Sequence, residues 1–203
     1  MTRYVKEKVE APHPADLKDL FLSPYYGWLV ERILQAIRPD TSHGETPEIP
    51  RYERNREPGT AAEIDFWTSR NLQPIRRSHV SFLVADTDGW EQQAGFAIDT
   101  HPGVIAFVKN AGLSFAIPYF ANGQSHEYVP DFLIRLKSKH PTTLILETKG
   151  YDPMKDVKRA AAERWVSAVN AEGSYGRWSF AMVGKTSAVK GAIDEAIERA
   201  NQD

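Results

Sequence analysis

The chain has 203 residues, of which 41% are hydrophobic and 26% charged, a composition typical of one globular domain of ordinary size. Its 25 basic and 27 acidic residues leave a formal net charge of −2, so the overall charge gives no reason to expect nucleic-acid binding and any such contact must be local. The lack of cysteine excludes disulfides and thiolate metal sites, and no apolar run approaches the roughly 18 residues of a membrane span.

The first 60 residues are expected to form a helical extension followed by a linker. Apolar residues at helical spacing predict a helix over residues 14–37, interrupted at Ser23-Pro24. Residues 38–60 are polar and rich in proline, which is typical of a linker. The opening residues MTRYVKEKVEAPHP lack the apolar segment of a secretory signal, so we expect a cytoplasmic chain without membrane contact. One domain is then expected over residues 61–203.

The first half of this domain begins with two short aromatic and β-branched runs, AEIDFWTS and HVSFLVAD, which predict strands over residues 62–69 and 79–86. DGWEQQAGFAIDTH predicts a helix over residues 88–101, and we take the helical region to end at Lys109 and Asn110. LSFAIPYF and HEYVPDFLIRL, over residues 113–120 and 126–136, predict a hairpin closed by the tight turn Asn122-Gly123.

The second half is expected to complete a mixed sheet. TTLILETK predicts a strand over residues 142–149, and Asp152-Pro153 predicts the N-cap and first residue of a helix over residues 153–170. GRWSFAMVG predicts a strand over residues 176–184, and an amphipathic helix over residues 188–200 closes the chain. The order helix, strand, strand, strand, helix, strand predicts an α/β fold with a mixed central sheet flanked by helices.

One predicted strand carries a carboxylate in its interior, and the next predicted strand ends in a carboxylate and a lysine. Side chains alternate along a strand, so Glu147 and Lys149 point the same way, and Asp131 lies on the preceding strand. Two neighbouring carboxylates suit Mg²⁺, and a lysine beside them can position a water molecule and offset negative charge. In the alternative interpretation, Asp131 and Glu147 pair with Lys149 and Arg135 at a solvated sheet end.

The residues around these carboxylates resemble a known family. PDFLIRL followed by LILETKG resembles the PD-(D/E)xK motif of restriction-endonuclease-like nucleases, and the predicted element order is similar to their αβββαβ core. The wider sequence, from HPGVIAFVKNAGLSFAIPYFANG through ETKGYDPMKDVKRAAAERWVSAVN to YGRW, resembles the C-terminal endonuclease region of type III restriction enzyme restriction subunits and their helicase-fused relatives. The resemblance covers about residues 60–185.

The resemblance implies a Mg²⁺-dependent endodeoxyribonuclease in which Mn²⁺ substitutes for Mg²⁺. By its motif, Asp131, Glu147 and the backbone carbonyl of Thr148 bind the metal, and Lys149 assists the attacking water. Many members add a glutamate from the first core helix, and Glu91 matches it. A structural alternative stays open, because Asp88 and Glu91 also have the spacing of a helix capping box.

Basic residues near the motif are candidates for binding DNA phosphates. They lie on the helix after ETKG, in the loop before that strand, and at the end of the first helical region: Lys155, Lys158 and Arg159; Lys137 and Lys139; and Lys109.

The resemblance also implies partners in a restriction or phage-defence system. DNA is the first partner, and a second copy of the chain would allow both strands to be cut. Gly184-Lys185-Thr186 lack the preceding loop glycine of a phosphate loop, because Ser179 stands at its position. A helicase motor is therefore expected either elsewhere in a longer protein or on a separate polypeptide.

Two other functions compete with the nuclease interpretation. A non-catalytic DNA-binding or assembly module that docks to a motor would keep the fold without needing all three charged residues of the motif. A two-carboxylate hydrolase acting on sugars would use Asp131 and Glu147, but it would explain neither Lys149 nor the basic helix.

Overall fold

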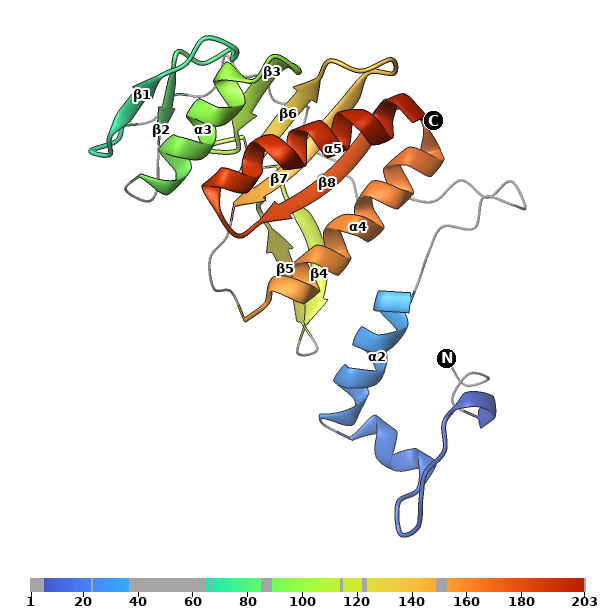
Figure 1. Ribbon diagram of the computed structural model, residues 1–203. Coiled ribbons are helices and arrows are strands. Elements are labelled where there is room, and N and C mark those ends of the chain that lie inside the picture. The colour runs from blue at the N-terminus through green and yellow to red at the C-terminus, as the bar shows by residue number, and fades with distance from the viewer. Residues whose placement is uncertain are drawn as a thin grey trace.

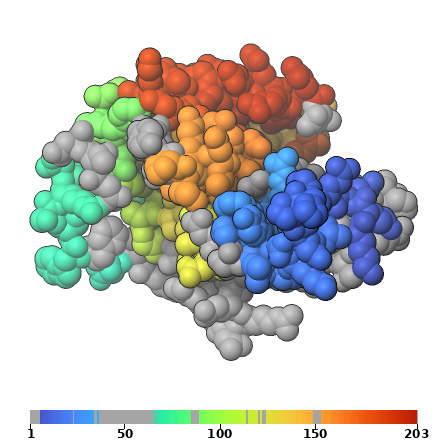
Figure 2. Space-filling model, turned by 90° about the horizontal axis from the view of Figure 1, so that it is seen from below, coloured from blue at the N-terminus to red at the C-terminus, as the bar shows by residue number. Residues whose placement is uncertain are grey.

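The computed structural model describes residues 6–22, 24–36, 65, 67–84, 89–113, 115–121, 124–148 and 153–202. Near the N-terminus a short 3₁₀ helix (Leu17–Phe21) precedes helix α2 (Tyr25–Ala36), which begins directly after Pro24 as the predicted interruption requires (Figure 1). Helix α2 contacts α4 and β4 of the main domain, and the blue N-terminal segment lies against the orange α4 in the space-filling view (Figure 2). The predicted linker over residues 38–60 lies outside the described residues.

A four-stranded mixed sheet forms the centre of the domain, in the order β3-β6-β7-β8. Its strands are β3 (Val104–Lys109), β6 (Phe132–Leu136), β7 (Thr142–Thr148) and β8 (Arg177–Val183). Strand β6 is antiparallel to both β3 and β7, whereas β8 runs parallel to β7. Helix α4 (Lys155–Glu172) makes the crossover between these parallel strands and ends at Gly173, whose φ of 80° suits glycine. The predicted α/β fold with a mixed sheet is confirmed.

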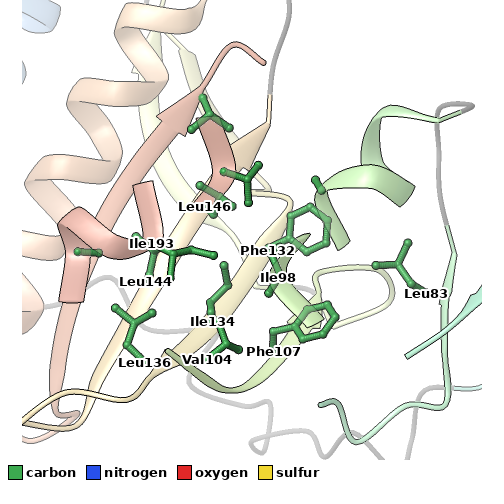
Figure 3. Close-up of a cluster of buried hydrophobic side chains, with 14 of the residues drawn as sticks. Leu83, Ile98, Val104, Phe107, Phe132, Ile134, Leu136, Leu144, Leu146 and Ile193 are labelled. Atoms are coloured by element: carbon green, nitrogen blue, oxygen red, sulfur yellow. The ribbon is translucent and has the colours of Figure 1, made fainter. Parts of the chain in front are cut away.

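Helices α3 (Trp90–Thr100) and α5 (Val189–Gln202) cover one face of the sheet (Figure 1). Alternate strand residues point to this face because successive side chains in a strand point to opposite sides. Figure 3 shows Phe132, Ile134, Leu144 and Leu146 meeting residues of both helices, such as Ile98 and Ile193, in one buried cluster. Burying each of these large apolar side chains stabilises the fold by about 1.5–3 kcal/mol.

The opposite face carries α4 and a separate two-stranded hairpin, β4 (Ile117–Ala121) with β5 (Gln124–Tyr128). An aromatic cluster joins these parts. Phe115, which leads into the hairpin, stacks on Trp178 of β8 with ring centroids 5.9 Å apart, and its edge meets Trp165 of α4. The hairpin is thereby fixed to the helix and to the sheet.

A smaller antiparallel pair, β1 (Leu72–Pro74) and β2 (Phe82–Val84), packs on α3. Of the two strands predicted over residues 62–69 and 79–86, the second contains β2, whereas the described residues of the first, 65 and 67–69, form no strand. Leu83 of β2 lies so close to Gly95 of α3 that a Cβ on Gly95 would be 2.4 Å from the Leu83 Cδ1 atom. The contact between strand and helix therefore depends on this glycine.

Arg77, in the loop between β1 and β2, lies along the outer edge of β3. Its backbone carbonyl accepts the N–H of Phe107 at 2.7 Å, and its guanidinium donates to the carbonyls of Val104, at 2.6 Å, and His101. The loop is held in turn by Asp99, whose carboxylate accepts the Arg77 backbone N–H at 2.8 Å. The edge of β3 is thus covered by backbone and side-chain hydrogen bonds.

The prediction that the helical region extends to Lys109 and Asn110 is wrong for the residues after Thr100. Helix α3 ends at Thr100, and Val104–Lys109 form β3, the outer strand of the central sheet. Proline and glycine at positions 102 and 103 interrupt the helical pattern, and the apolar, β-branched run that follows favours a strand.

The predicted hairpin is confirmed for β4 and β5, but the predicted returning strand is two strands. Strand β5 pairs with β4, whereas β6 pairs with β3 and β7 in the central sheet. Residues 129–131, between β5 and β6, belong to neither strand. Pro130 explains the break because proline has no N–H to donate to a strand ladder. The turn residues 122 and 123 lie outside the described residues.

The later predicted elements are confirmed with small shifts. Strands β7 and β8 and helix α5 match their predictions closely. Helix α4 begins at Lys155 with Met154 as its N-cap, two residues later than predicted, and the predicted cap Asp152 lies outside the described residues. Within the described parts of the chain, no helix has the length and apolarity that crossing a membrane requires.

Asn110 links the segment that leads from the central sheet into the β4–β5 hairpin to the segment that leads back into the sheet. Its side-chain amide donates to the carbonyls of Phe115, at 2.7 Å, and Pro130, at 3.0 Å, and its side-chain oxygen accepts the Phe115 N–H at 3.3 Å. Because Asn110 is buried, these groups have little access to replacement water. One side chain therefore ties together both ends of the insertion.

We expect Asn110→Ala to lower the free energy of unfolding by about 2–4 kcal/mol, since it leaves buried backbone groups without partners. Asn170 provides a matched control: it brackets Trp178 through the same amide and oxygen atoms, at 2.8 Å each, but it is exposed, so Asn170→Ala should lower stability by about 1 kcal/mol or less. Urea denaturation of both variants measures the difference. Equal losses would contradict the structural role given to Asn110.

Candidate functional site

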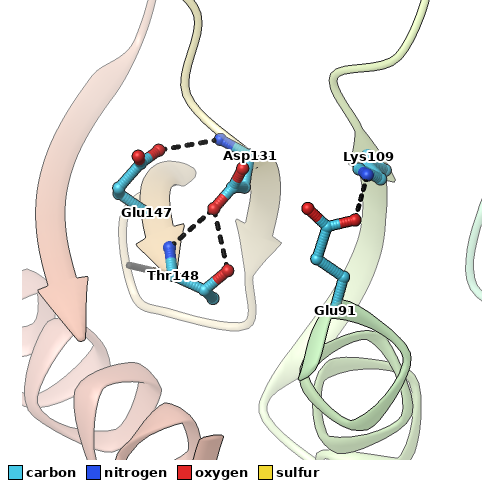
Figure 4. A network of polar contacts seen from close by, with 5 residues as sticks. All are labelled: Glu91, Lys109, Asp131, Glu147 and Thr148. Atoms are coloured by element: carbon cyan, nitrogen blue, oxygen red, sulfur yellow. Dashed lines mark hydrogen bonds and ion pairs between the residues drawn. The ribbon is translucent and has the colours of Figure 1, made fainter. Parts of the chain in front are cut away.

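Asp131 and Glu147 lie next to each other at one edge of the central sheet. Phe132 of β6 is paired with Leu146 of β7, so one further step along the antiparallel ladder sets Asp131 against Glu147. The backbone N–H of Asp131 donates to the Glu147 Oε2 atom at 3.2 Å (Figure 4). The two carboxylates that the sequence predicted to converge are therefore neighbours.

Thr148 orients the Asp131 carboxylate. Its backbone N–H and its hydroxyl both donate to the Asp131 Oδ2 atom, at 2.7 and 2.8 Å (Figure 4). The other oxygen, Oδ1, accepts no hydrogen bond from any residue that the structure describes. Asp131 thus has one oxygen held in place and another left for a further partner.

Burial and the hydrogen bonds from Thr148 act on the pKa of Asp131 in opposite directions. Burial raises the pKa of the Asp131 carboxyl above its usual value of 3.8, and this effect outweighs the two hydrogen bonds from Thr148, which lower it. The charge of Glu91 raises the pKa further, whereas the charge of Lys109 lowers it. Asp131 therefore lies in the electrostatic field of a second acidic residue and of a lysine.

Glu91 and Lys109 form a buried ion pair beside Asp131. The Lys109 Nζ atom contacts the Glu91 Oε2 atom, and the two side chains are 7% and 10% exposed (Figure 4). Glu91 comes from the first turn of α3 and Lys109 from the last residue of β3. Lys109, predicted to contact DNA phosphates, therefore lies inside the protein and is bound to a carboxylate.

Glu91 does not occupy the helix position that a capping box requires. The N-cap of α3 is Gly89, which makes Glu91 the second helical residue, whereas a capping box uses the third. Asp88, the predicted cap, lies outside the described residues. Glu91 points instead toward the sheet, where it meets Lys109 (Figure 4).

Lys149, predicted to assist an attacking water, also lies outside the described residues. It directly follows Thr148, the last residue of β7, so the chain places it next in sequence to the described network.

Apart from Lys109, the residues predicted to contact phosphates lie in two separate places. Lys155, Lys158 and Arg159 lie in the first turns of α4, which follows the end of β7 where Asp131 and Glu147 lie. The Lys158 ammonium lies 5.8 Å from the ring centroid of Tyr128 on β5. These three basic residues therefore follow the same end of the central strands at which the carboxylates lie.

Lys137 and Lys139 lie at the opposite end. They follow β6 in the turn that leads into β7, and the Lys139 backbone N–H donates to Asn201 of α5 at 2.8 Å. A strand of this length separates them from Asp131 by about 15 Å or more, at roughly 3.3 Å per residue. Their prediction as contacts beside the motif is corrected, because closeness in sequence here runs along a strand.

A hollow of about 350 Å³ opens between α4, β8 and α5, away from the carboxylates. Its lining includes Glu163, Arg177 and Arg199. Arg177 begins β8 and lies opposite Thr142 at the start of β7, so this hollow belongs to the far end of the sheet. It does not contribute to the acidic site.

The donor set at the sheet edge suits a hard divalent cation. Within the described residues no three His, Cys, Asp or Glu side chains group closely enough to hold a metal, so a cation here would be bound by two carboxylates, backbone oxygen and water. Mg²⁺ is commonly held in this way, by one or two carboxylates and several waters. The carbonyl of Thr148, the residue between Glu147 and Lys149, belongs to the same strand as Glu147.

Comparison of the chain with protein-family models, with curated proteins and with solved structures found no match.

The raised pKa of Asp131 predicts a specific pH dependence of stability in metal-free buffer. A carboxyl with a higher pKa in the folded state stabilises the fold below its unfolded pKa, near 3.8, and this contribution is lost as the pH rises through the folded pKa. Asp131→Asn removes the titration, so its unfolding free energy relative to wild type should rise from pH 3.5 toward neutrality.

The control for this comparison is Asp156→Asn, at an exposed carboxyl in the first turn of α4. Denaturant unfolding at closely spaced pH values gives both curves. If the difference between Asp131→Asn and wild type stayed flat or fell over the same range, burial would not dominate the site.

Proposed function

We propose that the chain is a Mg²⁺-dependent endodeoxyribonuclease that hydrolyses phosphodiester bonds of DNA. The observation that carries the proposal is the contact network of Asp131, Thr148 and Glu147 at one sheet edge, next to the position of Lys149. This network agrees with what a PD-(D/E)xK motif, which the sequence resembles, would require. The order α3, β3, β6, β7, α4, β8, with the β4–β5 hairpin inserted, also agrees with an αβββαβ core.

The residues fit Mg²⁺ by their chemistry. Asp131, Glu147 and the backbone carbonyl of Thr148 would bind the ion, and the Oδ1 atom of Asp131, which accepts no hydrogen bond from a described residue, supports this assignment. A bound Mg²⁺ would polarise the phosphate and lower the pKa of a water molecule. Mn²⁺ offers the same preference for oxygen ligands and should substitute.

Other residues of the protein would orient the reacting groups and offset the negative charge that develops during hydrolysis. Thr148 keeps the Asp131 carboxylate in one rotamer, so that no reorganisation is needed when the substrate arrives. Lys149 would hold the attacking water and offset the negative charge that develops on the phosphate oxygens. The first turns of α4 would hold the flanking DNA backbone through Lys155, Lys158 and Arg159.

The resemblance further supports a role as the cleavage module of a restriction or phage-defence system. In this proposal a helicase motor, in the same protein or in a partner subunit, moves the DNA, and a second nuclease copy cuts the other strand. The absence of a complete phosphate loop between Ser179 and Thr186 agrees with a motor located elsewhere.

Plasmid cleavage tests the proposed chemistry. With Mg²⁺ the wild-type chain should nick or linearise supercoiled DNA, and chelation should stop it. Glu147→Gln and Lys149→Ala should each lower the rate by about 100-fold or more, since each removes a group that acts on the transition state. Lys149→Ala should keep its DNA affinity. Glu163→Gln, on an exposed part of α4, is the control that should cleave normally.

Two results would count against this proposal. A Lys149→Ala variant that cuts at the wild-type rate would remove Lys149 from the mechanism. A wild-type chain that binds DNA but cleaves with neither Mg²⁺ nor Mn²⁺ would favour the non-catalytic DNA-binding module.

DNA binding should depend on the basic start of α4. Replacing Lys155, Lys158 and Arg159 together by alanine should weaken binding and reduce the slope of log affinity against log salt by up to about three phosphate contacts. The matched control replaces three basic residues of the opposite end of the sheet, Lys137, Lys139 and Arg199. Fluorescence anisotropy over a salt series measures both slopes. Equal slopes for the two triple variants would place the DNA elsewhere.

A further inference from the structure

Lys109 is a cation built into the acidic site. Lysine is seldom buried, yet the Lys109 side chain is 7% exposed and contacts the carboxylate of Glu91, which is itself 10% exposed. The pair joins the first turn of α3 to the last residue of β3. An ammonium group thus lies inside the protein where the sequence suggested a surface phosphate contact.

The ion pair lies against the proposed metal ligands. Lys109 is paired across the sheet with Phe132, which follows Asp131, and the Asn110 N–H donates to the Asp131 carbonyl at 2.8 Å. Figure 4 shows Glu91 reaching from its helix toward the sheet edge that carries Asp131 and Glu147, with its carboxylate turned to Lys109. Glu91 therefore brings a third carboxylate within electrostatic reach of Asp131 without joining it and Glu147 in one close cluster, and Lys109 neutralises this carboxylate from the helix.

We propose that the Lys109 ammonium occupies the place of a cation beside Glu91, so that Glu91 binds no divalent ion while Lys109 is present. The inference rests on the proposed function, because it concerns the same acidic site. It divides the three carboxylates by role: Asp131 and Glu147 face the single catalytic ion, and Glu91 is a positioning residue that holds Lys109. The site then takes one divalent ion per chain.

Charge balance gives the physical reason. A buried carboxylate needs a compensating charge or several hydrogen bonds, and Lys109 supplies this compensation to Glu91. A divalent ion at Glu91 would have to displace the ammonium or share the carboxylate with it at close range, and both are unfavourable. Removing the ammonium should instead create a vacant acidic position that a divalent ion fills.

The experiment counts bound ions in variants of Lys109. Titration calorimetry with Mn²⁺ should show that Lys109→Met and Lys109→Gln each bind one more ion than the wild-type chain. Lys109→Arg, which keeps the charge, should retain the wild-type number. In Glu91→Gln/Lys109→Met the additional ion should be lost, because its carboxylate is gone.

Melting temperature gives a second readout that needs no cleavage assay. Without metal, Lys109→Met and Lys109→Gln should melt below wild type, and saturating Mn²⁺ should raise their melting temperatures by more than it raises that of wild type. Glutamine keeps a hydrogen-bond donor for Glu91 and guards against a methionine variant that folds poorly. If both variants stayed unfolded at saturating Mn²⁺, the proposal would be overturned, since a cation should replace Lys109.

The number of ions separates this inference from the proposed function. The inference requires one additional, Glu91-dependent ion in the variants, whatever the wild-type number is. A wild-type chain that binds no Mn²⁺ would contradict the metal site at Asp131 and Glu147, and the variants would still decide the role of Lys109. No additional ion, or one that persists in Glu91→Gln/Lys109→Met, would overturn the inference.

Discussion

The antiparallel pairing of β6 with β7 determines where the polar groups of the site lie. Its register sets the residue before β6 against the residue before the end of β7, and this is why Asp131 donates its N–H to Glu147 and receives two hydrogen bonds from Thr148. A slip of one residue would turn every side chain of β6 to the other face of the sheet. The apolar residues Phe132 and Ile134 resist such a slip, because their burial fixes the register.

The inserted β4–β5 hairpin controls the start of β6. The chain leaves the sheet after β3, makes the hairpin on the face covered by α4, and returns at Pro130. The side chain of Asn110 donates to the carbonyl of Phe115 before the hairpin and to that of Pro130 after it. Its backbone N–H also donates to the Asp131 carbonyl. Position 131 is thus held from the β3 side by backbone and from the β7 side by Thr148. Two strands fix one carboxylate, and a rigid site follows from ordinary sheet geometry.

The parts of this arrangement that are local in sequence could be predicted. The strand TTLILETK and the final amphipathic helix carry clear patterns, and the pair Asp131 and Glu147 followed from strand alternation. The break at Pro130 also had a signal, since proline disfavours a central strand, but the apolar run around it suggested one continuous strand. Strand β3 was missed because its apolar residues follow a helix closely and most of them are buried, which hides the alternation of a half-exposed strand.

The tertiary relations could not be predicted from pattern alone. Lys109 and Glu91 are 18 residues apart, and their ion pair exists because α3 packs against β3. Lys137 and Lys139 are close to Asp131 in sequence but belong to the other end of β6. In both cases the arrangement of helices and strands in space decides which charges meet, and the number of residues between them does not.

The loop that carries Arg77 affects how this protein can meet other chains. Unpaired groups along an outer strand form a template on which a strand from another molecule can add. On β3 the Phe107 N–H and the Val104 carbonyl are already bound by Arg77, and Asp99 holds the loop in turn. Strand addition and edge-to-edge aggregation are therefore blocked on this side. A neighbour that extended the sheet would have to approach β8 between α4 and α5, so continuous sheets between copies can grow from one side of the domain and not from both.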